Sequence, residues 1–300
     1  MSAPIKKVTL VGPSGNLGET LFKAFVNSGK FDIQVLRRHG SKRTYPNNVK
    51  VVDVDFTSVE SLVEPLKGQD AVVSTLAEEA LDLQINIIDA AILAGVRRFV
   101  PSEFGSNLDN KNTRALPVFA RKVKTQDYLI EKAKTTSLTY TFVYNGPFLD
   151  WGLEHHFILN TSEYKPSLFD GGVQLFSTTT LETISQATIA LLEHPQETKN
   201  RAVYIEDIQI TQKRLYELAR QVAPEKPWAP SVESLDELRD KGFARAAQGI
   251  FDMETVVSLI SQALFRKDGG GIYEKTDNAL LGVKGKTEQD VVEMFKKVLQ

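Results

Sequence analysis

The sequence predicts an α/β fold in which helices cover both faces of a doubly wound parallel sheet. Short β-branched runs alternate with helical patterns through the first half of the chain, a rhythm typical of parallel sheets. The first run, residues 8–11, leads directly into a glycine-rich turn and then into a helical pattern. The apolar fraction of 42% and the charged fraction of 25% are ordinary for a globular protein, so a large core can be buried.

The turn after the first strand reads Gly12-Pro13-Ser14-Gly15-Asn16-Leu17-Gly18. We expect Gly12 to permit the tight turn, Gly15 to let the backbone approach a pyrophosphate, and Gly18 to let the helix pack closely on the strand. Free N–H groups at the helix start would then bind the anion. Because the spacing departs from G-x-G-x-x-G, the prediction of dinucleotide binding by these seven residues depends on the strand before and the helix after. The alternative is a structural turn without a ligand.

The second strand, residues 32–36, ends in a basic cluster, since four of the seven residues at 37–43 are Arg or Lys. An acidic residue about 20 positions past such a glycine turn binds the ribose 2′-hydroxyl of NAD, whereas arginine accommodates the 2′-phosphate of NADP. Arg37 lies 19 residues after Gly18. We therefore predict that Arg37, Arg38 and Lys42 select NADP(H). A solvated basic turn is the alternative.

Further elements follow at regular intervals. Strands are expected at residues 49–56, 71–76, 98–100 and 139–144, and helices at 58–66, 82–95 and 117–134. In a doubly wound sheet the ligand lies at the carboxyl ends of the strands. We therefore expect Asp55 and Phe56 to flank an adenine ring, and Ser74 and Thr75 to line the same edge.

Composition excludes several classes of protein. Lys and Arg total 36 against 38 for Asp and Glu, a net charge of −2, which argues against a nucleic-acid or membrane-surface partner. The absence of cysteine excludes disulfides and thiol chemistry. With four histidines and no H-E-x-x-H, no metal site is expected. No signal-peptide pattern or membrane-length apolar run is present, so a cytoplasmic protein is expected.

The loop after the fifth strand reads Pro101-Ser102-Glu103-Phe104-Gly105. Together with residues 97–100 and the glycine turn, it resembles the isoflavone reductase and phenylcoumaran benzylic ether reductase group. That group belongs to the NmrA-like branch of the atypical short-chain dehydrogenases. The resemblance covers residues 7 to about 149. It implies an NADP-binding Rossmann domain at 1–150, to which segments near 174–208 return, and a smaller α/β substrate-binding lobe at 151–300.

The helix at 117–134 carries the predicted catalytic group. At about 100° per residue, Lys122 falls inside the apolar arc of this helix, and an ammonium group is rarely buried without a partner. The resembling reductases use a single lysine here, which implies that Lys122 contacts the cofactor and acts as acid or base. Three alternatives stay open: a Lys122 head group in solvent, Lys124 in its place, or an ordinary dehydrogenase pair formed by Tyr128 and Lys132.

The sixth strand ends at Asn145-Gly146-Pro147-Phe148. The resemblance implies that Asn145 and Phe148 lie along the nicotinamide, whereas a turn with a core aromatic is the alternative. In the second half, strands are expected at 174–177 and 201–205 and helices at 183–193, 211–222, 234–241 and 255–265. Gly269-Gly270-Gly271 indicates a flexible loop, and residues 287–290 indicate a capping box for a last helix ending near residue 299.

These patterns predict an NADPH-dependent reductase that transfers hydride to a small aromatic or enone-type molecule. In the resembling enzymes the lysine assists deprotonation of a phenol or protonates after hydride delivery, and this implies the same role for Lys122. A monomer or homodimer is expected. A non-catalytic, dinucleotide-sensing regulator of the NmrA-like type is the second hypothesis, and the presence of Lys122 favours the enzyme.

Overall fold

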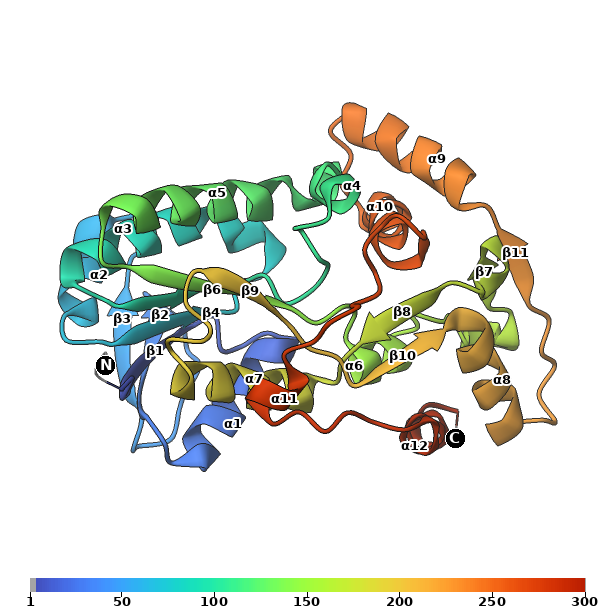
Figure 1. The fold of residues 1–300 in the computed structure, drawn as a ribbon, viewed down its shortest axis with the longest axis horizontal. Helices are drawn as coiled ribbons and strands as arrows, with labels where there is room; N and C mark the ends of the chain where they lie inside the picture. Colours follow the sequence, from blue (N-terminus) through green and yellow to red (C-terminus); the bar gives the residue numbers. More distant parts are fainter. Residues whose placement is uncertain (1–3, 300) are drawn as a thin grey trace. The chain divides into compact units, whose positions relative to one another are not determined.

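A computed structural model describes residues 4–299 (Figure 1). The chain divides into two units. The first contains the residues up to Phe104, Arg121–Val143 and Ile184–Val203, and the second contains Gly105–Ala120, Tyr144–Thr183 and the residues from Tyr204 onward. Each unit is therefore built from separate stretches of sequence.

A seven-stranded sheet confirms the predicted fold class. Its strands stand in the order β3-β2-β1-β4-β5-β6-β9. Their bounds are β1 Lys7–Val11, β2 Asp32–Arg38, β3 Lys50–Val54, β4 Ala71–Ser74, β5 Arg98–Val100, β6 Thr139–Tyr144 and β9 Arg201–Tyr204. All five pairs from β3 through β6 are parallel. The order reverses between β1 and β4, which is the point where ligands bind in doubly wound sheets.

Helices cover both faces of this sheet in the first unit. They are α1 (Asn16–Ser28), α2 (Val59–Leu66), α3 (Gln84–Ala94), α5 (Ala120–Thr135) and most of α7 (Leu181–Glu193), with the 3₁₀ turn η1 (Glu78–Leu83) before α3. Figure 1 shows α2, α3 and α5 on one face and α1 and α7 on the other. The N-cap of helix α1 is Gly15, whose backbone is extended.

The second unit combines short strands with amphipathic helices. Its strands are β7 (Ser167–Phe169), β8 (Leu175–Thr178), β10 (Ile208–Thr211) and β11 (Ser231–Glu233), paired as β8 with β10 and β7 with β11. Its helices are α4 (Lys111–Arg114), α6 (Leu149–Glu154), α8 (Gln212–Val222), α9 (Leu235–Ala247), α10 (Met253–Phe265), α11 (Asn278–Leu281) and α12 (Glu288–Val298). The capping box predicted for α12 is confirmed at Thr287 and Asp290.

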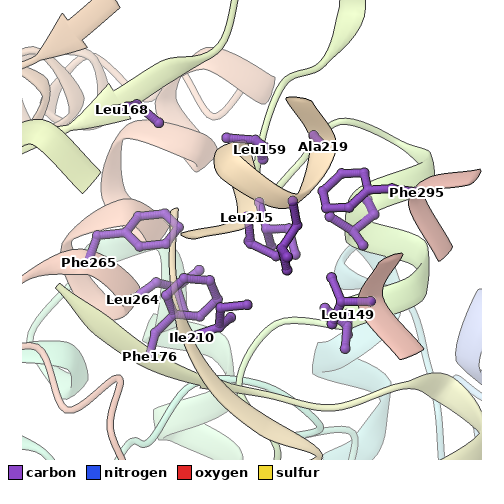
Figure 2. Close-up of a cluster of buried hydrophobic side chains, with 14 of the residues drawn as sticks. Leu149, Leu159, Leu168, Phe176, Ile210, Leu215, Ala219, Leu264, Phe265 and Phe295 are labelled. Carbon is purple, nitrogen blue, oxygen red and sulfur yellow. The ribbon is translucent and has the colours of Figure 1, made fainter. Parts of the chain in front are cut away.

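One apolar core holds the second unit together (Figure 2). Phe176 and Ile210 come from β8 and β10, Leu215 from α8, Phe265 from α10 and Phe295 from α12, and all are buried. The ring of Phe176 meets that of Phe265 edge to face at 5.1 Å between centroids. Helices α8 and α10 therefore pack against β10 and β8, and α12 packs against α8 and α6.

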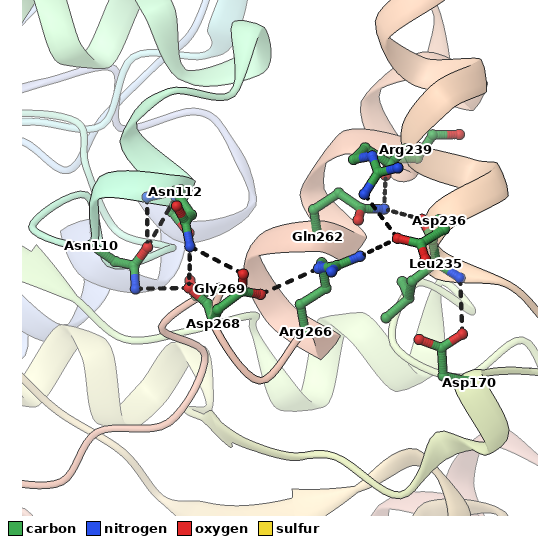
Figure 3. A network of polar contacts seen from close by, with 12 residues as sticks. Asn110, Asn112, Asp170, Leu235, Asp236, Arg239, Gln262, Arg266, Asp268 and Gly269 are labelled. Carbon is green, nitrogen blue, oxygen red and sulfur yellow. Dashed lines mark hydrogen bonds and ion pairs between the residues drawn. The ribbon is translucent and has the colours of Figure 1, made fainter.

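The triple-glycine segment is packed, which corrects the prediction of a flexible loop. A Cβ on Gly269 would lie 2.2 Å from the Gln262 carbonyl oxygen, and one on Gly271 would lie 2.3 Å from that of Leu264. Thr113 donates a hydrogen bond to the Gly269 carbonyl. Figure 3 shows the neighbouring polar network, in which Asn110 Nδ2 donates to the Asp268 carbonyl at 3.0 Å. The glycines serve close approach of backbone segments.

Candidate functional site

Two of the three glycines after β1 have the structural roles predicted for them. Gly12 has a φ of +76°, and a Cβ there would lie 2.8 Å from the Thr75 carbonyl group. A Cβ on Gly18 would lie 2.3 Å from the Gly12 carbonyl oxygen. The tight turn at Gly12 and the close helix packing at Gly18 are therefore confirmed. Both positions exclude a side chain because protein backbone already fills the space.

Gly15 is different, because the space beside it is open. No heavy atom lies within 4 Å of a Cβ built there, and its backbone has φ −79° and ψ 176°, which any residue adopts. As the N-cap of α1 it supplies no side-chain acceptor, so the first-turn N–H groups of Asn16, Leu17 and Gly18 receive no side-chain cap. This arrangement fits an anion such as a pyrophosphate. Pro13 and Ser14 complete the turn, in which Ser14 N–H donates to the Gly12 carbonyl at 2.8 Å.

The end of β4 braces this turn. Thr75 Oγ1 donates to the carbonyl oxygens of Val11 at 3.1 Å and Gly12 at 2.9 Å. The neighbouring Ser74 is fully buried, and its Oγ has no hydrogen-bond partner among residues 4–299. The structure therefore brings Thr75 and Ser74 beside the glycine turn, as the order of the strands requires.

Arg37, at the start of the basic cluster after β2, binds both the neighbouring strand β3 and the backbone of the cluster. Its guanidinium forms a two-point ion pair with Asp53 of β3, at 2.6 and 2.8 Å, and donates to the Arg43 carbonyl at 2.6 Å. The hydrogen bonds from Arg37 hold the pKa of Asp53 below its ordinary value. Arg38 and Lys42 are exposed. Sequence reasoning missed Asp53, which is brought opposite Arg37 by the β2–β3 register.

Asp55 and Phe56 lie together at the end of β3. The Asp55 carboxylate accepts hydrogen bonds from the Thr57 N–H at 2.8 Å and from its hydroxyl at 2.7 Å. These bonds hold the pKa of Asp55 below its ordinary value. Phe56 is buried, and its carbonyl accepts from Asn86 Nδ2 at 3.0 Å. Asp55 therefore also closes a local turn ahead of α2.

Lys122 lies in the first turn of α5 and is half-buried. Its ammonium group donates a hydrogen bond to the backbone carbonyl of Glu103, in the loop after β5. The head group is thus bound to protein. Lys124 is exposed, and its Nζ lies 3.3 Å from the Asp82 carboxylate of η1.

Tyr128 and Lys132 make a different contact, with Asp89 of α3. The Tyr128 hydroxyl donates to the Asp89 carboxylate, and Lys132 Nζ lies 3.9 Å from it. Burial, followed by the hydrogen bond to Asp89, raises the pKa of Tyr128, which opposes formation of a phenolate. Lys132 is ten residues, or about 15 Å, further along the helix than Lys122. The pair therefore joins α5 to α3.

Asn145 and Phe148 belong to the second unit and lie just before α6. Asn145 is fully buried, and its Nδ2 donates to the Gly146 carbonyl at 2.7 Å, while its Oδ1 has no partner among the described residues. The Phe148 ring meets that of Trp151 edge to face at 6.5 Å. Trp151 stacks on His155 at 4.5 Å, and its Nε1 is buried without an acceptor within residues 4–299.

The described residues contain neither a metal-binding cluster nor a membrane-spanning helix. Between residues 4 and 299, no three or more His, Cys, Asp or Glu side chains gather where they could hold a metal ion. In the same part of the chain, none of the helices has the length and apolar character needed to cross a bilayer.

The sheet order and the glycine turn define a doubly wound α/β protein of the Rossmann type. A model of the NmrA-like family matches residues 4–227, and the chain belongs to this family. Oxidoreductase poxI of Penicillium oxalicum is 30% identical over 304 residues, covering 98% of this chain and 94% of poxI. Oxidoreductase aprR of Aspergillus flavus is 35% identical over 209 residues, covering 69% of this chain and 70% of aprR.

Solved structures share the fold at low sequence identity. The ternary complex of leucoanthocyanidin reductase from Vitis vinifera has a TM-score of 0.76 at 18% identity and covers 98% of this chain and 100% of that one. The crystal structure of an isoflavone reductase has a TM-score of 0.74 at 20% identity, with 98% of each chain covered. The resemblance to the isoflavone reductase group is therefore confirmed at the level of family and fold.

Proposed function

We propose that this chain is an NADPH-dependent reductase that transfers hydride to a small aromatic or enone-type molecule, with Lys122 as the acid or base. Curated relatives that span most of the chain are named oxidoreductases. Neighbours of the same fold include leucoanthocyanidin reductase with NADPH from Vitis vinifera and the structure named AtPrR2 with NADP+ and (+)pinoresinol. These names support the reaction class and the cofactor.

The observation that carries the proposal is the open space at Gly15 in front of the uncapped start of α1. NADPH, when bound, supplies the hydride. The first-turn N–H groups of α1 bind its pyrophosphate. Arg38 and Lys42 take the 2′-phosphate, while Arg37 keeps their segment in place through Asp53 and the Arg43 carbonyl.

Lys122 moves the proton. One of its N–H groups donates to the Glu103 carbonyl. The other N–H groups, or the lone pair of the neutral amine, are left to exchange a proton with the substrate. A neutral Lys122 removes the proton of a phenol, and a protonated Lys122 delivers one to oxygen or carbon after hydride transfer. The fixed hydrogen bond keeps Nζ in one place in both states.

An aromatic substrate with an oxygen atom is supported by the surface of α6. The Trp151 ring contacts the rings of Phe148, His155 and Phe157, with the Trp151 and Phe157 centroids 6.0 Å apart. Buried indole N–H groups usually have an acceptor, and Trp151 Nε1 has none among the described residues. A substrate oxygen supplies that acceptor.

The experiment is a turnover assay with NADPH and aromatic enones, starting with benzylideneacetone, followed by loss of NADPH absorbance. Wild-type protein is expected to reduce at least one compound, and Lys122→Ala is expected to reduce none while still binding NADPH. Replacing Trp151 by Phe is expected to raise KM for an oxygen-bearing substrate by about tenfold. NADPH binding without reduction of any compound would contradict the enzyme and favour the dinucleotide-sensing regulator.

A further inference from the structure

The loop after β5 is anchored by Gln84, the first residue of α3. Gln84 is fully buried, and its Oε1 accepts a hydrogen bond from the Ser102 N–H at 2.8 Å. The Ser102 hydroxyl donates to the Leu76 carbonyl, also at 2.8 Å. A buried side-chain amide is costly unless it is hydrogen-bonded, so this contact fixes both Gln84 and the loop.

The contact with Gln84 fixes one peptide plane. The Ser102 N–H and the Pro101 carbonyl belong to the same planar peptide unit. Its N–H is held by Gln84, and its carbonyl accepts from the Glu103 N–H at 2.8 Å. Both edges of the plane are therefore bound, and the direction in which the chain continues through Glu103 is set.

Two residues further along, the Glu103 carbonyl holds the ammonium group of Lys122. Phe104 then adopts a φ of +34°, a conformation that non-glycine residues hold only when their surroundings impose it. A series of contacts thus connects Gln84 through Ser102 and Glu103 to Lys122. All the residues in this series belong to the first unit.

We propose that Gln84 is a positioning residue for Lys122. It holds the Pro101–Ser102 peptide, and the peptide aims the Glu103 carbonyl at Nζ. This inference rests on the proposed function, in which Lys122 transfers the proton, but the placement of Nζ can be measured without a substrate. Gln84 contacts Lys122 only through the loop, so it acts on the position of Nζ and leaves the glycine turn unchanged.

The test compares Gln84→Met with Gln84→Glu. Methionine has a similar shape but no oxygen to accept from Ser102, whereas glutamate keeps an acceptor at the same place. Lysines are dimethylated with ¹³C-formaldehyde, and the Lys122 signal is assigned by its loss in Lys122→Arg. In Gln84→Met this signal is expected to move to the position of exposed lysines such as Lys124. In Gln84→Glu it is expected to return toward its wild-type position.

Binding and turnover provide the second readout. NADPH affinity is expected to stay within about twofold of wild type in both variants, because the glycine turn is intact. With an active substrate, kcat of Gln84→Met is expected to fall about tenfold or more at an unchanged KM, since a misplaced catalytic group costs up to about 100-fold. Gln84→Glu is expected to restore most of the rate.

Several results would overturn the proposal. A Lys122 signal that is identical in wild type and folded Gln84→Met shows that Gln84 does not position it. Should Gln84→Met fail to fold, the wild-type protein gives the answer: fast hydrogen exchange of the Ser102 amide, or a Lys122 signal that coincides with Lys124, refutes the series of contacts. Absence of NADPH binding by wild type would refute the proposed function alone, because the Lys122 signal does not depend on the cofactor.

Discussion

Replacing Gly15 and Gly18 separately by alanine tests the assigned roles of the glycine turn. At Gly15 the backbone conformation suits alanine, and the new Cβ meets no atom within 4 Å. Such a change gains about 0.4–1 kcal/mol through the unfolded state, but alanine is a poorer N-cap than glycine by a similar amount. We therefore expect the Tm of Gly15→Ala to stay within about 3 °C of wild type. At Gly18 the new Cβ would lie 2.3 Å from the Gly12 carbonyl oxygen, and overpacking of this kind costs about 1–3 kcal/mol or more.

The two variants should therefore separate stability from binding. In Gly15→Ala the added methyl stands where the pyrophosphate approaches the backbone, and a clash of about 1–3 kcal/mol weakens NADPH binding about 5- to 150-fold. Thermal unfolding and NADPH fluorescence titration on the same preparations measure both quantities. Gly15→Ala with wild-type affinity for NADPH would refute the placement of the pyrophosphate. A fall in its Tm as large as that of Gly18→Ala would refute the geometry of the turn.

Three further predictions concern single side chains. Lys122→Ala should lower turnover by at least about 100-fold and leave NADPH affinity nearly unchanged. Lys124→Ala is the matched control in steady-state assays. Equal rates for the two variants would contradict the proposed role of Lys122 as acid or base. Arg38→Ala should weaken NADPH about tenfold or more without changing NADH affinity, as measured by fluorescence titration, and an equal loss for both would indicate general damage. The third prediction concerns Asp70. Burial raises the pKa of its carboxyl group, but hydrogen bonds from the N–H groups of Lys7 and Lys6 and from the Arg97 guanidinium lower it by more. The pKa of Asp70 therefore lies below its ordinary value. Its stabilising contribution is therefore present at neutral pH and lost as pH falls below 3.8. Asp70→Ala should unfold more easily in urea by about 2 kcal/mol at pH 7, with a smaller difference in acid, and a constant difference would contradict the assignment.

The glycine turn and the partnered lysine of α5 were accessible from sequence because their causes are local. The roles of Gly12 and Gly18 follow from a strand–turn–helix pattern over a few residues. The apolar arc of one helix predicted that Lys122 needs a partner. The partner itself, the Glu103 carbonyl, was not predictable, because its direction depends on a turn held by Gln84. Likewise, the ion pair of Arg37 depends on the register between two strands.

In the second unit, local signals found the longer helices and strand β8 but missed β7, β10 and β11. The amphipathic patterns of α8 and α12 are long enough to indicate their faces. Strands β7, β10 and β11 have only three or four residues. The equally short β5 was found because it belongs to the regular alternation of strands and helices in the first half of the chain, and these three strands lack that context. The packing of Gly269 depends on Thr113, which is 156 positions away in the chain, so composition alone indicated a flexible loop there.

Calorimetric titration of the wild-type protein with NADPH and with NADH measures the proposed cofactor site itself. We expect one site per chain, tight binding of NADPH, and binding of NADH weaker by about tenfold or more because the contacts of Arg38 and Lys42 to the 2′-phosphate are lost. Absence of heat with either nucleotide at hundreds of micromolar, under conditions where the protein is folded, would contradict the cofactor site and the reductase proposal with it.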